Sequence, residues 1–242
     1  PDDLQAANEG RPTAFGLVHN AYANGMNQAT RHAFAILKPE ERGFVLTRAG
    51  YAGIQRLAAV WTGDNNSWWE HLQVMIPMIM GLGTSGVVFA GADVGGFQEN
   101  ATPELFARWV EAAALTPFFR GHSNINSRSH EPWSFGPAVE AIARRYITLR
   151  YRLLPYIYTL FEEAARTGHP VMRPLVYHFP QDPRVHRLQD EFLLGTSLLV
   201  APVTAVARDH RSVYLPEGRW YDFWTGEPVA EDEREPLRAS TL

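Results

Sequence analysis

Cysteine is absent from the 242-residue sequence, which excludes disulfide bonds and thiolate metal sites. The absence fits a reducing compartment, so we expect a cytoplasmic protein, and a secretory signal upstream of Pro1 stays an open alternative. No apolar run approaches the roughly 20 residues of a membrane-spanning helix, so no membrane partner is expected. Basic blocks are missing too, with 22 Lys and Arg against 26 Asp and Glu, so nucleic acid is not an expected partner either.

The sequence also lacks the motifs of the common metal and cofactor sites. Its nine histidines form no HExxH and no close pair flanked by acidic ligands, and neither a P-loop nor a GxSxG elbow occurs. Residues 81–86 match GxGxxG, but they follow a helix-like segment and precede a strand-like one, the reverse of a dinucleotide site. We interpret them as a helix-to-strand loop, and we expect no cofactor and no metal.

Apolar residues are plentiful, and their arrangement indicates the fold. They make up 45% of the chain, which is ample for a packed core. Four short apolar runs alternate with longer helix-like segments, an order typical of parallel βα units. The runs are residues 43–48, 57–61, 87–91 and 116–120. We therefore predict an α/β fold that contains the later strands of a (β/α)8 TIM barrel.

Capping signals predict where the intervening helices begin. Ser67 and Glu70 have the spacing of a capping box, and Thr102 followed by proline is a second helix start. A long helical pattern over residues 139–160 should kink or split at Pro155 and end at Gly168.

The pattern changes after Gly168. Strand-like runs at 171–179, 192–200 and 213–221 are separated by turn residues with no helix between them, which predicts an antiparallel, β-sandwich-like domain. We therefore predict two domains. Residues 1–168 form the C-terminal portion of the barrel, and residues 169–242 form the β-domain, which is itself expected to be truncated. The charged last stretch, residues 229–242, is expected to fray.

Polar residues follow all four predicted barrel strands. They are Arg48, Asp64, Asp93 and His122. A single polar residue after a strand is more often a turn or a helix cap. Four in succession predict a shared site, because (β/α)8 enzymes build their active sites at the C-terminal ends of the strands.

Aromatic residues beside these strand ends favour a sugar ligand. Indole and phenyl faces pack on the apolar C–H faces of pyranose rings, and we expect Trp61 and Phe97 to provide them. Asp64 lies between Trp61 and Trp68, where an apolar surround would help it hold a proton. Asp64 is thus a candidate general acid, and Asp93 would be the second carboxylate.

An ordered series of motifs resembles glycoside hydrolase family 31. The motifs are Phe44-Val-Leu-Thr-Arg48, Trp61-Thr-Gly-Asp-Asn65, Gly91-Ala-Asp-Val-Gly-Gly-Phe97, Phe119-Arg-Gly-His122, Glu131-Pro-Trp133, Leu149-Arg-Tyr-Arg-Leu-Leu-Pro-Tyr156, Met172-Arg-Pro174, Leu199-Val-Ala-Pro202 and Leu215-Pro-Glu-Gly-Arg-Trp-Tyr-Asp222. The resemblance implies that Asp64 is the general acid/base. It implies that Arg48, Asp93 and His122 bind the sugar and that Trp61 and Phe97 form hydrophobic walls, so Asp93 becomes an anchor.

The resemblance also implies a retaining α-glycosidase, most consistent with an α-glucosidase acting on non-reducing ends of oligosaccharides. The family's nucleophile motif is missing, and His19-Asn-Ala-Tyr22 resembles the segment that follows it, so we expect the nucleophile upstream of Pro1 and no activity in the isolated chain. An open barrel edge would favour aggregation or a homo-oligomer. The alternatives are an α-xylosidase, an α-transglycosylase, an α-glucan lyase or a catalytically inactive sugar-binding homologue.

Overall fold

Parallel strands form the centre of the computed structural model, which describes residues 4–229. Strands β3 (Leu46–Thr47), β4 (Ala59–Trp61) and β5 (Ala90–Gly91) pair in chain order. Just after β5, strand β6 (Asp93–Val94) pairs with β7 (Arg120–Gly121). The order β3, β4, β5/β6, β7 is the order of successive parallel strands in a barrel, so the predicted partial (β/α)8 fold is confirmed.

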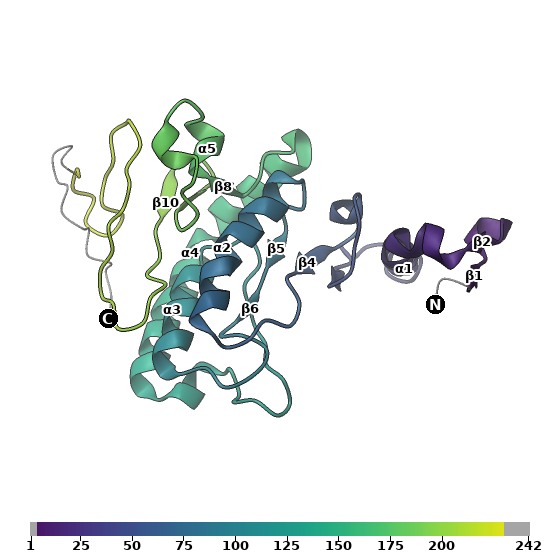
Figure 1. Cartoon of the computed structure of the whole chain (residues 1–242), viewed down its shortest axis with the longest axis horizontal. Helices are drawn as coiled ribbons and strands as arrows, with labels where there is room; N and C mark the ends of the chain where they lie inside the picture. Colours follow the sequence, from purple (N-terminus) through teal and green to yellow (C-terminus); the bar gives the residue numbers. More distant parts are fainter. Residues whose placement is uncertain (1–3, 230–242) are drawn as a thin grey trace.

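Three helices connect and cover these strands. Helix α2 (Trp69–Thr84) leads from β4 to β5, α3 (Pro103–Ala113) leads from β6 to β7, and α4 (Pro137–Thr167) follows the short 3-10 helix η3 (Pro132–Phe135). Figure 1 shows them gathered into one body over the strands. Leu72, Ile76 and Trp109 are fully buried in the core between them. This shared core keeps the strand ends, and the loops that leave them, in fixed relative positions.

The helix starts and breaks agree only in part with the sequence predictions. Thr102 does cap α3, since its hydroxyl accepts the Leu105 N–H at 3.2 Å. The capping box at Ser67 is wrong: the Ser67 hydroxyl is buried without a partner, and the His71 ring accepts the Asn66 N–H at 2.7 Å. The helix is not split at Pro155, because α4 continues through it with buried side chains on both sides of the proline, and a kink there stays a prediction. Packing of that face outweighs the one backbone bond that proline removes.

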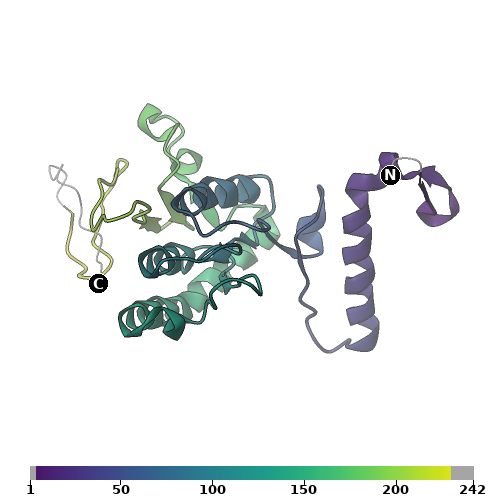
Figure 2. The same ribbon diagram turned by 60° about the horizontal axis from the view of Figure 1, so that its bottom comes forward.

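The N-terminal part stands apart from this body. A small hairpin of β1 (Gln5–Ala6) and β2 (Thr13–Ala14), with η1 (Asn8–Gly10) at its turn, leads into helix α1 (Phe15–Leu37). Figures 1 and 2 show α1 beyond β4, away from the other helices. It is tied to the chain after β3 through Asn24, whose amide accepts the Tyr51 N–H at 2.9 Å and donates to the Ala52 carbonyl at 3.1 Å. This helix was not predicted from the sequence, and it exposes several large apolar side chains: Leu17, Tyr22, Met26, Ile36 and Leu37.

The C-terminal part contains the predicted antiparallel sheet. Strands β8 (Met172–Pro174), β9 (Phe192–Leu194) and β10 (Leu198–Val200) pair in the order β10-β9-β8. The expectation of strands without helices is wrong, since α5 (Leu175–His178) and η4 (Pro183–Val185) lie between β8 and β9. Residues 213–221 contribute only the isolated bridge of Tyr221 with Pro228. Met172 and Phe192 share the core of α2 to α4, so the boundary after residue 168 stays a prediction.

The predicted fraying of residues 229–242 concerns a stretch that lies, apart from residue 229, outside the described residues. In the described part, no helix has the length and apolar character needed to cross a membrane. Between β3 and β4 the described chain forms only the 3-10 helix η2 (Ile54–Arg56) instead of a barrel helix.

Candidate active site

All six predicted site residues lie at or just after the C-terminal ends of the parallel strands. Arg48 follows β3, Trp61 ends β4 and Asp64 comes three residues later. Asp93 lies in β6, where it is in register with Arg120 of β7. Phe97 and His122 follow β6 and β7 respectively. Because the strands are parallel and adjacent, these ends share one rim.

Arg48 and Asp64 form the outer part of this rim. The Arg48 Nη1 lies 3.4 Å from the Asp64 Oδ1, and the two side chains keep 61% and 39% of their exposure. Gly63, next to Asp64, has a backbone φ of +86°, a conformation that favours glycine. Asp64 is therefore a carboxylate that solvent and a ligand can both reach.

Asp93 is the opposite case, a carboxylate with no exposed surface. Its Oδ1 accepts from the Arg120 Nε at 3.1 Å and also from the Arg120 Nη2, while its Oδ2 has no hydrogen-bond partner. Burial raises the pKa of the Asp93 carboxyl above its usual range, and the hydrogen bonds and charge of Arg120 oppose that rise. The nearby His122 also lowers this pKa, and the Asp64 charge raises it.

Two aromatic side chains contact polar residues of this rim. The Arg120 guanidinium carbon lies 5.0 Å from the centre of the Trp61 ring, within the range of a cation–π contact. Phe97 and His122 stack with ring centres 5.1 Å apart and planes inclined by 28°. The predicted hydrophobic walls therefore each contact a polar member of the site.

Backbone hydrogen bonds join the loops that carry these residues. The Asn65 carbonyl accepts the Phe97 N–H at 2.6 Å, and the Phe97 carbonyl accepts the Asn124 N–H at 2.8 Å. The Asn65 amide donates to the Asp93 carbonyl at 3.3 Å. Gly96 permits the close approach of the loop after β6 to the backbone at Ser67, since a Cβ at Gly96 would lie 2.4 Å from the Ser67 nitrogen. The loops after β4, β6 and β7 thus form one connected layer.

Unpartnered buried polar atoms gather at this layer. Within residues 4–229, eight buried side-chain nitrogen or oxygen atoms have no partner, and four of them belong to residues at this rim. They are Trp61 Nε1, Asn65 Oδ1, Ser67 Oγ and Asp93 Oδ2. Folded proteins pair nearly all such atoms, so a cluster of exceptions marks a place where water or a ligand completes the bonding.

Arg120 is the site residue that the sequence analysis missed. The run Phe119-Arg-Gly-His122 contributes to the family resemblance, but the sequence alone assigned Arg120 no role. A signal existed in the sequence: Arg120 precedes His122 by two positions, and alternate residues of a strand point to the same face. The register with Asp93, which makes the pairing specific, needed the structure.

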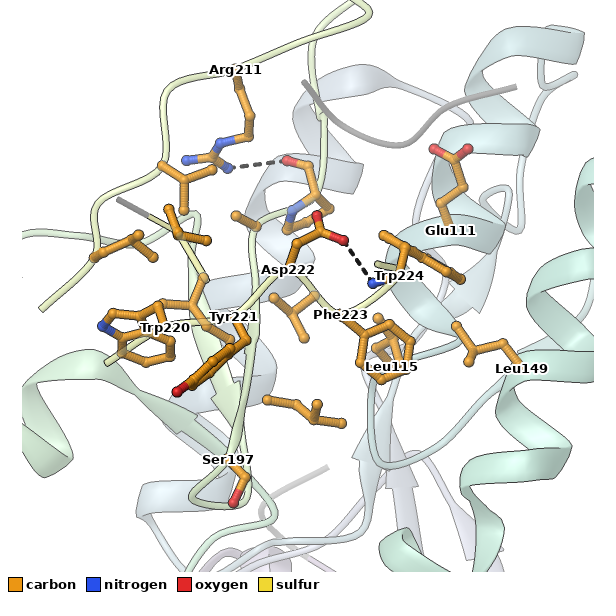
Figure 3. Close-up of a pocket in the computed structure, with 18 of the residues that line it drawn as sticks. Glu111, Leu115, Leu149, Ser197, Arg211, Trp220, Tyr221, Asp222, Phe223 and Trp224 are labelled. Atoms are coloured by element: carbon orange, nitrogen blue, oxygen red, sulfur yellow. Dashed lines mark hydrogen bonds between the residues drawn. The ribbon is translucent and has the colours of Figure 1, made fainter. Parts of the chain in front are cut away.

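One cavity of the described part lies away from this rim. A cavity of about 740 Å³ separates α4 from the segment after β10, and Figure 3 shows its lining, which includes Leu149, Trp220 and Trp224. Two of its polar groups are engaged, because Arg211 donates to the Pro202 carbonyl and Asp222 accepts the Trp224 N–H at 2.8 Å, whereas the buried Glu111 Oε1 has no partner among the described residues. None of the six predicted site residues lines this cavity.

A smaller cavity, of about 660 Å³, adjoins the rim. Arg48 and Trp61 line it together with residues of α2 and of the loop after β3, among them Tyr51 and Leu82. In the described residues, no three histidine or acidic side chains gather in a way that could hold a metal.

Comparison with known proteins assigns the family. Residues 2–160 match the TIM-barrel domain of glycosyl hydrolases family 31, and residues 168–241 match that family's C-terminal domain. Alpha-glucosidase 2 of Bacillus thermoamyloliquefaciens is 51% identical over 220 residues, 91% of this chain and 28% of that protein. A probable glucan 1,3-alpha-glucosidase of Oryza sativa subsp. japonica is 47% identical over 215 residues, 87% of this chain and 23% of that protein.

Solved structures give the same result. The glucosidase II alpha subunit in its Tris-bound form superposes with a TM-score of 0.85 at 40% identity over 88% of this chain and 24% of that chain. A GH31 alpha-xylosidase from a soil metagenome gives 0.77 at 30% identity over 86% of this chain and 34% of that chain. The chain thus spans between about a quarter and a third of the length of these relatives. It belongs to glycosyl hydrolase family 31.

Proposed function

We propose that this chain is the acid/base-bearing part of a retaining α-glucosidase that hydrolyses non-reducing-end α-glucosidic bonds of oligosaccharides. The observation that carries the proposal is the contrast between two carboxylates on one rim. Asp64 is exposed beside Arg48, whereas Asp93 is buried under Arg120. A general acid must reach the leaving oxygen and then water, and an accessible carboxylate meets that requirement.

In the proposed reaction Asp64 protonates the glycosidic oxygen as the bond to the sugar breaks. It then removes a proton from the water that attacks the covalent glycosyl-enzyme intermediate. Arg48, Asp93 and His122 would hydrogen-bond the sugar hydroxyls, and Trp61 and Phe97 would pack on its apolar faces. The Oδ2 of Asp93 is unpartnered but has no exposed surface in this chain, so it would accept a hydroxyl only once the sugar displaces the groups that cover it.

The nucleophile belongs, in this proposal, to protein outside the 242 residues. Retaining glycosidases need a second carboxylate roughly 5–5.5 Å from the acid/base. Asp93 is poorly suited, because a nucleophilic oxygen must reach the anomeric carbon and Asp93 is fully buried with one oxygen bound to Arg120. The relatives are several times longer than this chain, which leaves ample sequence for the missing group.

The substrate assignment favours glucosides over xylosides. Curated relatives with 43–51% identity carry alpha-glucosidase names, among them neutral alpha-glucosidase C of Mus musculus, whereas the alpha-xylosidase structure is 30% identical. A transglycosylase or a lyase would share the barrel. A catalytically inactive sugar-binding homologue would have less need of an accessible carboxylate at Asp64.

The test is complementation. The chain is assayed with p-nitrophenyl α-glucoside and α-xyloside, alone and co-expressed with the part of Alpha-glucosidase 2 that precedes its matching region. We expect no turnover by the chain alone, and glucoside hydrolysis with retained anomeric configuration in the complemented protein, slowed by Asp64→Asn. For Asp64→Asn the larger loss is expected on maltose, which needs a proton on its leaving oxygen, and a smaller loss on the activated p-nitrophenyl glucoside. Turnover by the isolated chain would return the nucleophile role to Asp93, and a preference for the xyloside would reject the glucosidase assignment.

A further inference from the structure

Arg120 makes two different contacts with one guanidinium group. Its Nε and Nη2 both donate to the Oδ1 of Asp93, and its central carbon lies over the Trp61 ring at 5.0 Å. The Arg120 side chain keeps 25% of its exposure, so it forms part of the rim surface. It also lies 5.8 Å from the Phe118 ring centre, which limits its freedom on a third side.

The two bonds to one oxygen leave the other oxygen free. Arginine often binds a carboxylate with one bond to each oxygen, which would satisfy both. Here both donors converge on Oδ1, and Oδ2 is buried with no partner among the described residues. The neighbouring Trp61 Nε1 is likewise buried and unpartnered. One acceptor and one donor are therefore left on residues that Arg120 contacts.

We propose that Arg120 is a positioning residue of the sugar site, which holds the Asp93 carboxylate and the Trp61 ring in the orientations that meet the substrate. The proposal rests on the proposed glycosidase function, and Arg120 acts through its two neighbours. A buried carboxylate can keep its charge only if a partner compensates the lost hydration. Arg120 supplies that compensation from the side away from Oδ2, so the free oxygen remains an acceptor.

Lysine cannot take over this arrangement. Its ammonium is a single point donor on a flexible stem, whereas the guanidinium plane both forks onto a carboxylate and stacks on a ring. We therefore expect Arg120→Lys to keep the positive charge but to lose the fixed orientation of the Asp93 carboxylate and the Trp61 ring. Arg120→Met should lose both the charge and the orientation. Comparing the two variants separates the electrostatic contribution of Arg120 from its geometric one.

The first experiment measures the Asp93 carboxyl directly. Carbon-13 NMR of the chain, with the resonance assigned through Asp93→Asn, follows its titration. We expect its midpoint to rise by about one to three pH units in Arg120→Met and by less in Arg120→Lys. The matched control is Arg128→Met, whose guanidinium contacts the Phe135 ring at 5.2 Å, and it should leave the midpoint unchanged. An unchanged midpoint in both Arg120 variants would overturn the proposal.

A second experiment uses the complemented enzyme. Arg120→Lys should lower kcat/KM by about 10- to 100-fold, the effect expected for a lost charged hydrogen bond, and should raise the pH of the acidic limb of its pH profile. Wild-type kcat/KM and pH profile in Arg120→Lys would reject the positioning role. If the complemented wild type hydrolyses no glucoside while the NMR midpoint still shifts, the proposed function fails and the Arg120–Asp93 coupling stands.

A double variant keeps the proposal testable if Arg120→Met fails to fold. Arg120→Met leaves a buried carboxylate unpaired and could unfold the chain, whereas Arg120→Met with Asp93→Asn removes both charges. We expect the double variant to be more stable than Arg120→Met alone. Equal stability would show that Arg120 does not act through Asp93, against the proposal.

Discussion

Arg48 and Asp64 face each other across the ends of two adjacent strands, with Nη1 and Oδ1 3.4 Å apart. Both side chains are substantially exposed, and an exposed ion pair at this distance contributes little to stability because solvent screens it. The contact can therefore orient Asp64 without trapping it. A loosely held carboxylate can exchange its arginine contact for a leaving-group oxygen, as an acid/base must.

Replacing Asp64 is expected to separate two classes of substrate in the complemented enzyme. Asp64→Ala should slow hydrolysis of maltose by about 10²–10⁴-fold, the usual contribution of general acid/base catalysis. A substrate with a good leaving group needs no proton in the first step, so glycosylation by p-nitrophenyl α-glucoside should suffer less. Initial-rate kinetics on both substrates measure the difference.

Azide provides the control for this variant, because it attacks the glycosyl-enzyme without help from a base. Added azide should restore turnover of Asp64→Ala on the activated substrate and leave the wild-type rate unchanged. Equal losses on both substrates together with no azide effect would assign Asp64 a structural or binding role.

The placement of the candidate residues could be predicted further from the sequence than the elements around them. Arg48, Asp93 and His122 could be placed at one rim because each comes at the end of a short apolar run, and parallel strands bring such ends together whatever the details of packing. Arg120 escaped because its importance depends on a register with Asp93 that no local pattern contains. Helix α1 was not predicted although Phe15, Val18, Tyr22 and Met26 repeat at helical spacing, and in this chain several of its large apolar side chains are exposed.

The two predicted helix caps differ in the structure, because Thr102 caps α3 and Ser67 caps no helix, and this difference can be measured as stability. Thr102→Ala removes a hydroxyl that accepts the Leu105 N–H, so it should lower the free energy of unfolding by about 1 kcal/mol. Ser67→Ala removes a buried hydroxyl without a partner, so it should be neutral or slightly stabilising. Urea unfolding of both variants measures the contrast. A larger loss in Ser67→Ala than in Thr102→Ala would contradict the structure at both positions.

Gly96 is expected to be essential to the loop layer over the strand ends. It has a φ of +87°, and an added Cβ would lie 2.4 Å from the Ser67 nitrogen, a backbone atom that cannot move alone. Gly168, at the end of α4, has a φ of +79° and open space around it. Both alanine variants carry left-handed strain, but only Gly96→Ala adds a clash.

Gly96→Ala should therefore be less stable than Gly168→Ala by about 1–3 kcal/mol, the usual cost of overpacking. Urea unfolding measures the difference, and the complemented enzyme should lose activity only in Gly96→Ala, because the clash displaces the loop between Asp64 and Asp93. Equal stability of the two variants would show that the loops yield to the extra methyl group.

Glu191 should make the stability of the chain depend on pH near neutrality. Its carboxylate is buried, accepts the Tyr214 N–H at 3.0 Å and bonds the Arg211 Nη2 at 3.0 Å. Burial raises the pKa of Glu191 from its ordinary 4.5 to about 7, with the Asp190 charge adding to the rise and Tyr214 and Arg211 opposing it. The folded chain therefore holds this proton more tightly than the unfolded chain does.

The sign of the effect follows from that difference. The stabilisation due to the Glu191 proton is fully present below pH 4.5 and is lost as the pH rises to about 7. The loss amounts to about 3 kcal/mol, because each tenfold difference in proton affinity between the folded and unfolded chains corresponds to roughly 1.4 kcal/mol.

Glu191→Gln keeps the acceptor for the Tyr214 N–H and cannot ionise. Relative to wild type, it should therefore gain about 3 kcal/mol between these two pH values, measured by urea unfolding across the range. Glu140→Gln, which removes an exposed partner of Arg144, is the control and should run parallel to wild type. Parallel curves for Glu191→Gln and wild type would mean that Arg211 holds Glu191 ionised throughout the range.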